Sequence, residues 1–188
     1  MKAGIIGFGY MGHFHLNKSR QLDTLEMIAA YDVNPEKLDD ARAEGLTAYE
    51  DLAAFLANPE IELVFVCTPN NVHAELAIAA LRAGKHVMCE KPVTMNSREL
   101  EEVIAVANEA HRVFTVHQNR RWDADYLMTK QVVDSREIGN ITTIQSRVYG
   151  QRGVCFGWRA DPVAGGGMLY DWGIHLIDQL LCMFRGHK

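Results

Sequence analysis

The sequence predicts an α/β protein whose first part folds as a doubly wound parallel sheet. Short, nearly continuous apolar runs recur along the chain, helix-like segments separate them, and the first run ends in a glycine-rich loop. Such runs are typical of parallel strands that are buried on both faces. Strands that alternate with helices indicate successive βαβ units. The expected strands are residues 3–6, 27–31, 63–66, 86–89 and 113–116.

Local signals mark the ends of the helices between these strands. Asn34-Pro35 is typical of a helix start, with an N-cap followed by proline at the first helical position, and Gly45 is a plausible stop. Apolar side chains between residues 72 and 83 recur on one helical stripe. Asn96 and Glu99 have the spacing of a capping box, and apolar residues then repeat at helical spacing.

The pattern changes after about residue 120. We expect a polar loop, a helix over residues 125–133, a strand rich in Thr, Ile and Val over residues 141–149, and a final helix over residues 168–184. One strand and one or two helices do not make a self-sufficient domain. The expected organisation is a nucleotide-binding domain over residues 1–120 and the incomplete start of a second domain over residues 121–188.

Composition places the chain among globular proteins and excludes several functions. Its 188 residues are 48% hydrophobic and 23% charged, with a formal net charge of −5. This balance argues against nucleic acid binding, which usually needs a basic face. No apolar run has the roughly 18–20 residues of a membrane span, and no signal-type cleavage site follows the start. The four cysteines fit no C-x-x-C pair and no zinc spacing, so we expect a reduced, cytoplasmic protein.

The loop Gly7-x-Gly9-x-x-Gly12 follows a predicted strand and opens a predicted helix. The first glycine permits a tight turn, the second lets a pyrophosphate approach the backbone, and the third allows close helix packing. Asp32 follows at the spacing of roughly 20 residues at which a carboxylate accepts hydrogen bonds from an adenosine ribose. The pattern predicts a dinucleotide site, with a turn of incidental glycines as the alternative. Because a carboxylate repels a 2′-phosphate, NAD is favoured over NADP.

Two further motifs carry chemistry. Glu90-Lys91-Pro92 follows a predicted strand at the edge where open α/β sheets bind ligands, so Lys91 is expected to point toward a cofactor. Asp171 and His175 are spaced i, i+4 on a predicted helix, where a carboxylate can orient an imidazole for proton transfer. The alternative is a carboxylate that stabilises the helix dipole beside a partly buried histidine. No established ligand spacing supports a metal site, and none is expected.

These motifs resemble the glucose–fructose oxidoreductase / inositol dehydrogenase / rhizopine catabolism (Gfo/Idh/MocA) family of NAD(P)-dependent oxidoreductases. The resemblance runs from residue 3 to about residue 184 and implies a Rossmann domain followed by an α+β domain on a large, mostly antiparallel sheet. Family members are usually much longer than this chain, so we expect a fragment, with a natural short form as the alternative. The matching motifs are the glycine loop, Cys67-Thr68-Pro69-Asn70 with His73, Glu90-Lys91-Pro92, Gln118-Asn119-Arg120-Arg121-Trp122 and residues 165–178.

The resemblance also implies roles for individual residues. Lys91, Asp171 and His175 are the expected catalytic residues. Family members mostly oxidise or reduce a carbinol or carbonyl in sugars, cyclitols and related polyols, and a full-length version is expected to be a homo-oligomer. The residues expected to line the cofactor are Gly7, Phe8, Gly9, Tyr10, Met11, Gly12, Asp32, Thr68, Asn70, His73, Glu90 and Lys91.

The predicted reaction is hydride transfer between nicotinamide and a hydroxyl-bearing carbon. His175 is the predicted base that takes the proton of the substrate hydroxyl. Lys91 is expected to hydrogen-bond the same hydroxyl oxygen, and Asp171 is expected to orient the imidazole of His175. Trp158, Arg159 and Arg121 are candidates for the substrate pocket, each with an equally plausible structural role. The alternatives are an NAD-dependent glycosidase of the same family and a non-catalytic NAD-binding sensor or inactive fragment.

Overall fold

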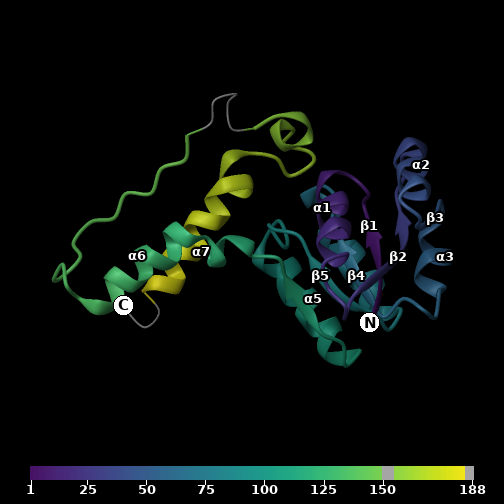
Figure 1. Cartoon of the computed structure of the whole chain (residues 1–188), viewed down its shortest axis with the longest axis horizontal. Helices are drawn as coiled ribbons and strands as arrows, with labels where there is room; N and C mark the ends of the chain where they lie inside the picture. Colours follow the sequence, from purple (N-terminus) through teal and green to yellow (C-terminus); the bar gives the residue numbers. More distant parts are fainter. Residues whose placement is uncertain (150–154, 185–188) are drawn as a thin grey trace. The chain divides into compact units, whose positions relative to one another are not determined.

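The structure is a computed structural model that describes residues 1–149 and 155–184. Its contacts divide the chain into two compact units, Met1–His117 and Gln118–Lys188. The first unit is a six-stranded sheet with helices on both faces, drawn from purple to teal in Figure 1. No helix within the described residues combines the length and apolarity needed to cross a membrane.

Every strand of this sheet pairs in parallel with its neighbours, in the order β3-β2-β1-β4-β5-β6. The doubly wound parallel sheet predicted from the sequence is therefore confirmed. The chain adds β2 and β3 on one side of β1, then crosses over and adds β4, β5 and β6 on the other side. Ligands of such sheets bind at the carboxyl ends of the strands beside this crossover point, which lies between β1 and β4. The strands are β1 (Lys2–Ile6), β2 (Glu26–Tyr31), β3 (Thr47–Tyr49), β4 (Leu63–Val66), β5 (His86–Cys89) and β6 (Phe114–Val116).

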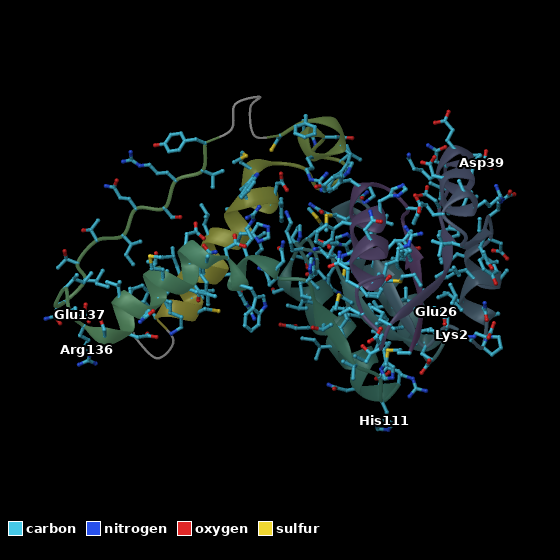
Figure 2. The ribbon with its side chains drawn as sticks, viewed as in Figure 1. Lys2, Glu26, Asp39, His111, Arg136 and Glu137 are labelled. Carbon is cyan, nitrogen blue, oxygen red and sulfur yellow. The ribbon has the colours of Figure 1, made fainter. Side chains whose placement is uncertain are left out.

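The opposite, amino edge of the sheet carries exposed charges. Lys2 and Glu26 are register partners at the starts of β1 and β2, and both are labelled in Figure 2. A hollow of about 430 Å³ lies at this edge, lined among others by Lys2, Arg20, Glu26 and Glu44. It contains none of the motif residues, so the chemistry predicted from the sequence belongs to the other edge.

The predicted helix signals act as expected. The Asn34 side chain accepts the Glu36 N–H at 3.0 Å, with proline at the first helical position. The Asn96 side chain accepts the Glu99 N–H at 3.0 Å, as in a capping box, while the Glu99 carboxylate accepts the N–H of Met95, the residue before the N-cap, at 2.9 Å. The helices of the first unit are α1 (Tyr10–Ser19), α2 (Pro35–Ala43), α3 (Leu52–Ala57), α4 (His73–Arg82) and α5 (Ser97–Glu109).

Two buried clusters, one on each side of the sheet, form the core. Successive residues of a strand enter opposite clusters: Ile5 belongs to the cluster with α1 and α2, and Ile6 belongs to the cluster with α3, α4 and α5. In β4, Phe65 faces the first cluster and Val66 the second. Burial on both faces explains why these strands read as continuous apolar runs.

Strand β3 and helix α3 were not predicted. The strand has only three residues, too few to give a periodic signal. Helix α3 is short, and its start is fixed by the Asp51 carboxylate, which accepts the N–H groups of Ala53 and Ala54 at 3.1 and 3.2 Å. Asp51 before the alanine-rich segment was therefore a helix-start signal from which α3 could have been predicted.

The second unit is helical in its described part. Helices α6 (Ala124–Ser135) and α7 (Ile174–Met183) pack against each other, and a π-helical turn, Leu169–Gly173, leads into α7 (Figure 1). The predicted helix over residues 125–133 is confirmed. The final helix also forms, although its first turn is π-helical rather than α-helical.

The strand predicted over residues 141–149 is wrong. These residues form neither strand nor helix, and most of their side chains are exposed. A strand needs a partner, and the described part of the second unit contains no other strand with which it could pair. Local β-propensity alone does not replace that partner. The mostly antiparallel sheet expected of the second domain is accordingly not shown.

The fully buried ring of Phe55 supports one face of the sheet, and we predict a large cost for removing it. A Cβ on Gly4 would lie 2.6 Å from this ring, so the ring rests directly on the β1 backbone. Phe55→Ala should lower the free energy of unfolding by roughly 3–5 kcal/mol through lost burial and an unfilled cavity. Urea unfolding followed by circular dichroism measures this change.

Val113→Ala is the matched control, because the Val113 side chain is 62% exposed. It should change the free energy of unfolding by no more than about 0.5 kcal/mol. A Phe55→Ala variant as stable as this control would contradict the packing described here.

Candidate functional site

The glycine loop after β1 is tight enough to require glycine at two positions. Gly7 has a φ of +91°, and a Cβ there would lie 2.9 Å from the Cys67 carbonyl. A Cβ on Gly12 would lie 2.7 Å from the Gly7 carbonyl oxygen. The loop is thus pressed against the end of β4, directly at the point where the chain reverses across the sheet.

The space above the second glycine of the loop is open. Gly9 is the N-cap of α1, no side chain caps this helix, and a Cβ on Gly9 would meet nothing within 4 Å. The first N–H groups of a helix carry partial positive charge and bind anions. Gly9 therefore leaves room at this helix end for the pyrophosphate of a dinucleotide.

Asp32 follows β2, and its carboxylate is held by two main-chain donors. One oxygen accepts the Phe8 N–H at 2.7 Å and the other accepts the Asn34 N–H at 2.9 Å. The carboxylate thereby joins the glycine loop to the end of β2. Each carboxylate oxygen can accept more than one hydrogen bond, so capacity remains for the hydroxyls of a ribose.

Thr68, just after β4, supplies a separate indication of a ligand. Among the buried side-chain nitrogen and oxygen atoms of the described residues, its hydroxyl oxygen is the one that lacks a hydrogen-bond partner. The Thr68 methyl group lies 2.9 Å from where a Cβ of Gly7 would stand, so this hydroxyl belongs to the same edge as the glycine loop. Buried polar groups are rarely left unsatisfied, and a bound dinucleotide would provide the missing partner.

Glu90 follows β5 and is the centre of a buried cluster. Its Oε1 accepts hydrogen bonds from His15 Nε2 at 2.7 Å and from His117 Nδ1 at 2.9 Å. Its Oε2 accepts the main-chain N–H of Lys91 at 3.3 Å. Burial by itself would raise the pKa of Glu90, but the hydrogen bonds and charges of the two histidines outweigh it and hold this pKa at about 2. The carboxylate is therefore ionised.

His73 joins the two loops that flank this cluster. Its ring is fully buried, with Nδ1 2.8 Å from the Pro92 carbonyl oxygen and Nε2 2.9 Å from the Thr68 carbonyl oxygen. Burial lowers the pKa of His73, against the opposing effect of the two carbonyl groups. The ring thus fastens the loop that carries Lys91 to the loop that carries Thr68.

In the second unit, His175 is oriented by a side-chain amide. Its Nδ1 lies 3.1 Å from Gln118 Oε1, and the Gln118 amide nitrogen lies 3.5 Å from the Ile174 carbonyl oxygen. An amide oxygen only accepts, so Nδ1 carries the proton in the neutral imidazole. The lone pair then lies on Nε2, which is the nitrogen that can act as a base.

Asp171 and Asp178, both near His175 in sequence, are paired with arginines. Asp171 Oδ1 accepts a hydrogen bond from Arg159 Nε at 3.3 Å, and the Arg159 guanidinium lies over the Trp158 ring at 4.4 Å. Asp178 binds Arg121 with both oxygens, at 2.7 Å for the Nε bond. The three residues suggested above for the substrate pocket, Trp158, Arg159 and Arg121, therefore all make structural contacts within this unit.

The sequence predicted no role for three residues of the site, although Gln118 lies in one of the motifs that resemble the family. His15 and His117 complete the Glu90 cluster, and Gln118 orients His175. One signal was available for His15, which is a polar residue on the buried face of an otherwise ordinary helix. His117 gives no local signal, and the motif that contains Gln118 does not reveal its role, because the partners of both residues are distant in sequence.

Cys67 is half-buried directly after β4, and Cys89 is fully buried at the end of the neighbouring strand β5. Burial raises the pKa of both thiols, and the nearby Glu90 carboxylate raises it further. A thiol that stays protonated is neither a good nucleophile nor a good metal ligand. Cys89 belongs to one core cluster, and Cys67 packs against the other.

Comparison with known proteins agrees with these features. Residues 1–118 match an oxidoreductase family with an NAD-binding Rossmann fold, and residues 126–187 match the GFO/IDH/MocA C-terminal domain. A scyllo-inositol 2-dehydrogenase (NADP(+)) from Bacillus subtilis is 34% identical over 188 residues, which cover 98% of this chain and 52% of that protein. A myo-inositol 2-dehydrogenase from Thermotoga maritima is 32% identical over 151 residues, 78% of this chain and 45% of that protein.

A solved structure gives the same result. The NAD-binding protein from Listeria innocua superposes with a TM-score of 0.93 at 44% identity, over 98% of this chain and 55% of that one. The chain spans about half the length of the curated relatives it matches. The resemblance noted from the motifs is confirmed, and the chain belongs to the Gfo/Idh/MocA family of oxidoreductases with an NAD-binding Rossmann fold.

Proposed function

We propose that this chain carries the cofactor site and catalytic residues of an NAD-dependent dehydrogenase. The substrate class is a sugar, cyclitol or related polyol with a secondary hydroxyl group. The observation that carries the proposal is the carboxyl edge of the sheet, where the open helix end at Gly9, the fixed carboxylate of Asp32 and the unsatisfied hydroxyl of Thr68 occur together. The substrate class is supported by relatives named as inositol dehydrogenases.

The positions of α1 and Asp32 give the proposed dinucleotide one orientation along this edge. The N–H groups at the start of α1 would bind the pyrophosphate, and Asp32 would accept hydrogen bonds from the adenosine ribose. The nicotinamide half then belongs to the ends of β4, β5 and β6, where the Thr68 hydroxyl and Lys91 are found. When bound, NAD supplies the carbon that accepts or returns the hydride.

The protein's own residues manage the proton and the charge on the substrate oxygen. Lys91 would donate a hydrogen bond to this oxygen and stabilise the charge that develops as its proton leaves. His175, with its lone pair on Nε2, would take that proton. Asp171 would act together with Arg159, as an ion pair that fixes the turn preceding His175.

The first prediction concerns the choice between NAD and NADP. The chain should bind NADH more tightly than NADPH, because the Asp32 carboxylate repels a 2′-phosphate. Asp32→Ser should weaken NADH binding about tenfold while weakening NADPH binding less, so that the ratio of the two dissociation constants approaches one. Fluorescence titration with each reduced cofactor measures both constants.

Asp23→Ser is the matched control for charge, since Asp23 is exposed just before β2 at the amino edge of the sheet. It should leave both dissociation constants unchanged. Equal or tighter binding of NADPH by the wild-type chain would overturn the argument from Asp32, and binding of neither cofactor would overturn the proposed function.

The second prediction concerns Lys91. Lys91→Ala should lower kcat for NAD reduction with an inositol or sugar by roughly 10²–10⁴-fold, because the substrate oxygen loses its proton-sharing and charge-stabilising partner. The dissociation constant for NADH should change by less than about threefold. Steady-state absorbance at the NADH band and fluorescence titration measure the two quantities separately.

Lys18→Ala, an exposed change in the last turn of α1, is the control and should leave kcat unaltered. If Lys91→Ala turned over within a few-fold of the wild type, the assignment of Lys91 as catalytic would be wrong. Tightly retained NAD with release of a sugar, and no net reduction, would instead indicate the glycosidase reaction.

A further inference from the structure

The His15–Glu90–His117 cluster connects three elements at the edge where the nicotinamide half is placed. His15 lies on α1, Glu90 follows β5 and His117 follows β6. Glu90 is only 7% exposed and His15 only 6%, so the cluster is largely shielded from water. The ligand atoms of all three side chains lie within 4.8 Å of one another. A charge placed here is weakly screened and acts on neighbouring groups.

The hydrogen bonds fix which ring nitrogens carry hydrogen. A carboxylate only accepts, so His15 must carry its hydrogen on Nε2 and His117 must carry its hydrogen on Nδ1. A neutral imidazole supplies one such N–H, and neither ring has to be protonated to make its bond. The negative charge of the cluster is that of the ionised Glu90 carboxylate, which both rings hold in place by hydrogen bonds.

The spacing favours hydrogen bonds over a shared metal ion. Zinc–ligand bonds of about 2.0–2.2 Å in a tetrahedral site hold ligand atoms roughly 3.3 Å or more apart. The nitrogen–oxygen distances here are 2.7 and 2.9 Å, which are the lengths of charge-assisted hydrogen bonds. The cluster is therefore described by its carboxylate charge, and a metal ion becomes an outcome of the test.

The positive charge of Lys91 opposes the electrostatic effect of the Glu90 carboxylate on its surroundings. This lysine follows Glu90 directly, and its main-chain N–H is bound to Glu90 Oε2 at 3.3 Å. The thiols of Cys67 and Cys89 stay neutral, because burial and the Glu90 charge raise their pKa. Changing Glu90 alone leaves Lys91 in place, so the contribution of the carboxylate can be isolated.

We infer that this cluster holds a fixed negative charge beside the nicotinamide and so favours the oxidised, cationic ring over the reduced, neutral one. Glu90 provides the charge, and His15 and His117 are positioning residues that act through it. The inference rests on the proposed function in taking NAD as the ligand. It adds a direction, since the protein would hold NAD⁺ ready to accept hydride and would release NADH more easily.

The decisive variant is Glu90→Gln, which removes the charge and keeps the shape. Calorimetric titration of the whole chain with NAD⁺ and with NADH at fixed salt should show the dissociation constant for NAD⁺ rising roughly tenfold or more. The dissociation constant for NADH should change by less than about threefold. Glu102→Gln, the same change at an exposed position on α5, should move neither.

Substitution of the histidines tests their positioning role. Glutamine at position 15 places an amide N–H near Nε2, and asparagine at position 117 places one near Nδ1, so His15→Gln and His117→Asn should keep the NAD⁺ preference within about twofold. The double change His15→Leu with His117→Leu removes both donors. A buried carboxylate without partners takes up a proton, so this variant should lose the preference as Glu90→Gln does.

Three results would overturn the inference. In Glu90→Gln, an equal change in both dissociation constants means that Glu90 is merely structural, and no change in either means that its charge is not felt at the ring. A NAD⁺ preference that alters after the wild-type chain is treated with a chelator assigns the charge to a metal ion. If the wild-type chain binds neither form, the proposed function fails and the inference fails with it.

Discussion

The register of the parallel sheet is the constraint on which the first unit depends. Ile6 is level with Tyr31 on one side and with Val66 on the other, Val66 is level with Cys89, and Cys89 is level with Val116. Main-chain hydrogen bonds of 2.8–2.9 Å continue this row by one residue after β1, β4, β5 and β6. The residues that follow the row are Gly7, Asp32, Cys67, Glu90 and His117, and they form the edge at which the site is built.

This register explains how far sequence reasoning could go. A strand end is recognisable from its apolar run, and the parallel arrangement sends all such ends to one edge. Gly7, Asp32 and Glu90 could therefore be assigned to one region from the sequence alone. Their partners could not, because the bond from Phe8 to Asp32 and the bond from His15 to Glu90 depend on side-chain directions and helix placement. These bonds join residues that are far apart in sequence and leave no periodic trace.

The second unit shows the opposite limit. Its helices could be predicted from local pattern, whereas the segment over residues 141–149 could not be assigned correctly from β-propensity. A helix satisfies its backbone hydrogen bonds within itself, but a strand must borrow them from a neighbour. Whether β-rich residues form a strand is thus decided by the rest of the sheet, which lies outside the segment itself. The same dependence on distant partners hid the role of Gln118 beside His175.

The energetics of Glu90 connect cofactor binding to the loop that carries Lys91. Removing a carboxylate from water is costly, and here the cost is offset only while His15 and His117 both stay in place. Because His15 is part of α1, the helix expected to bind the pyrophosphate cannot shift without weakening the bonds that keep Glu90 ionised. Glu90 in turn holds the main chain of Lys91. The buried carboxylate therefore links the position of α1 to the position of the loop that carries Lys91.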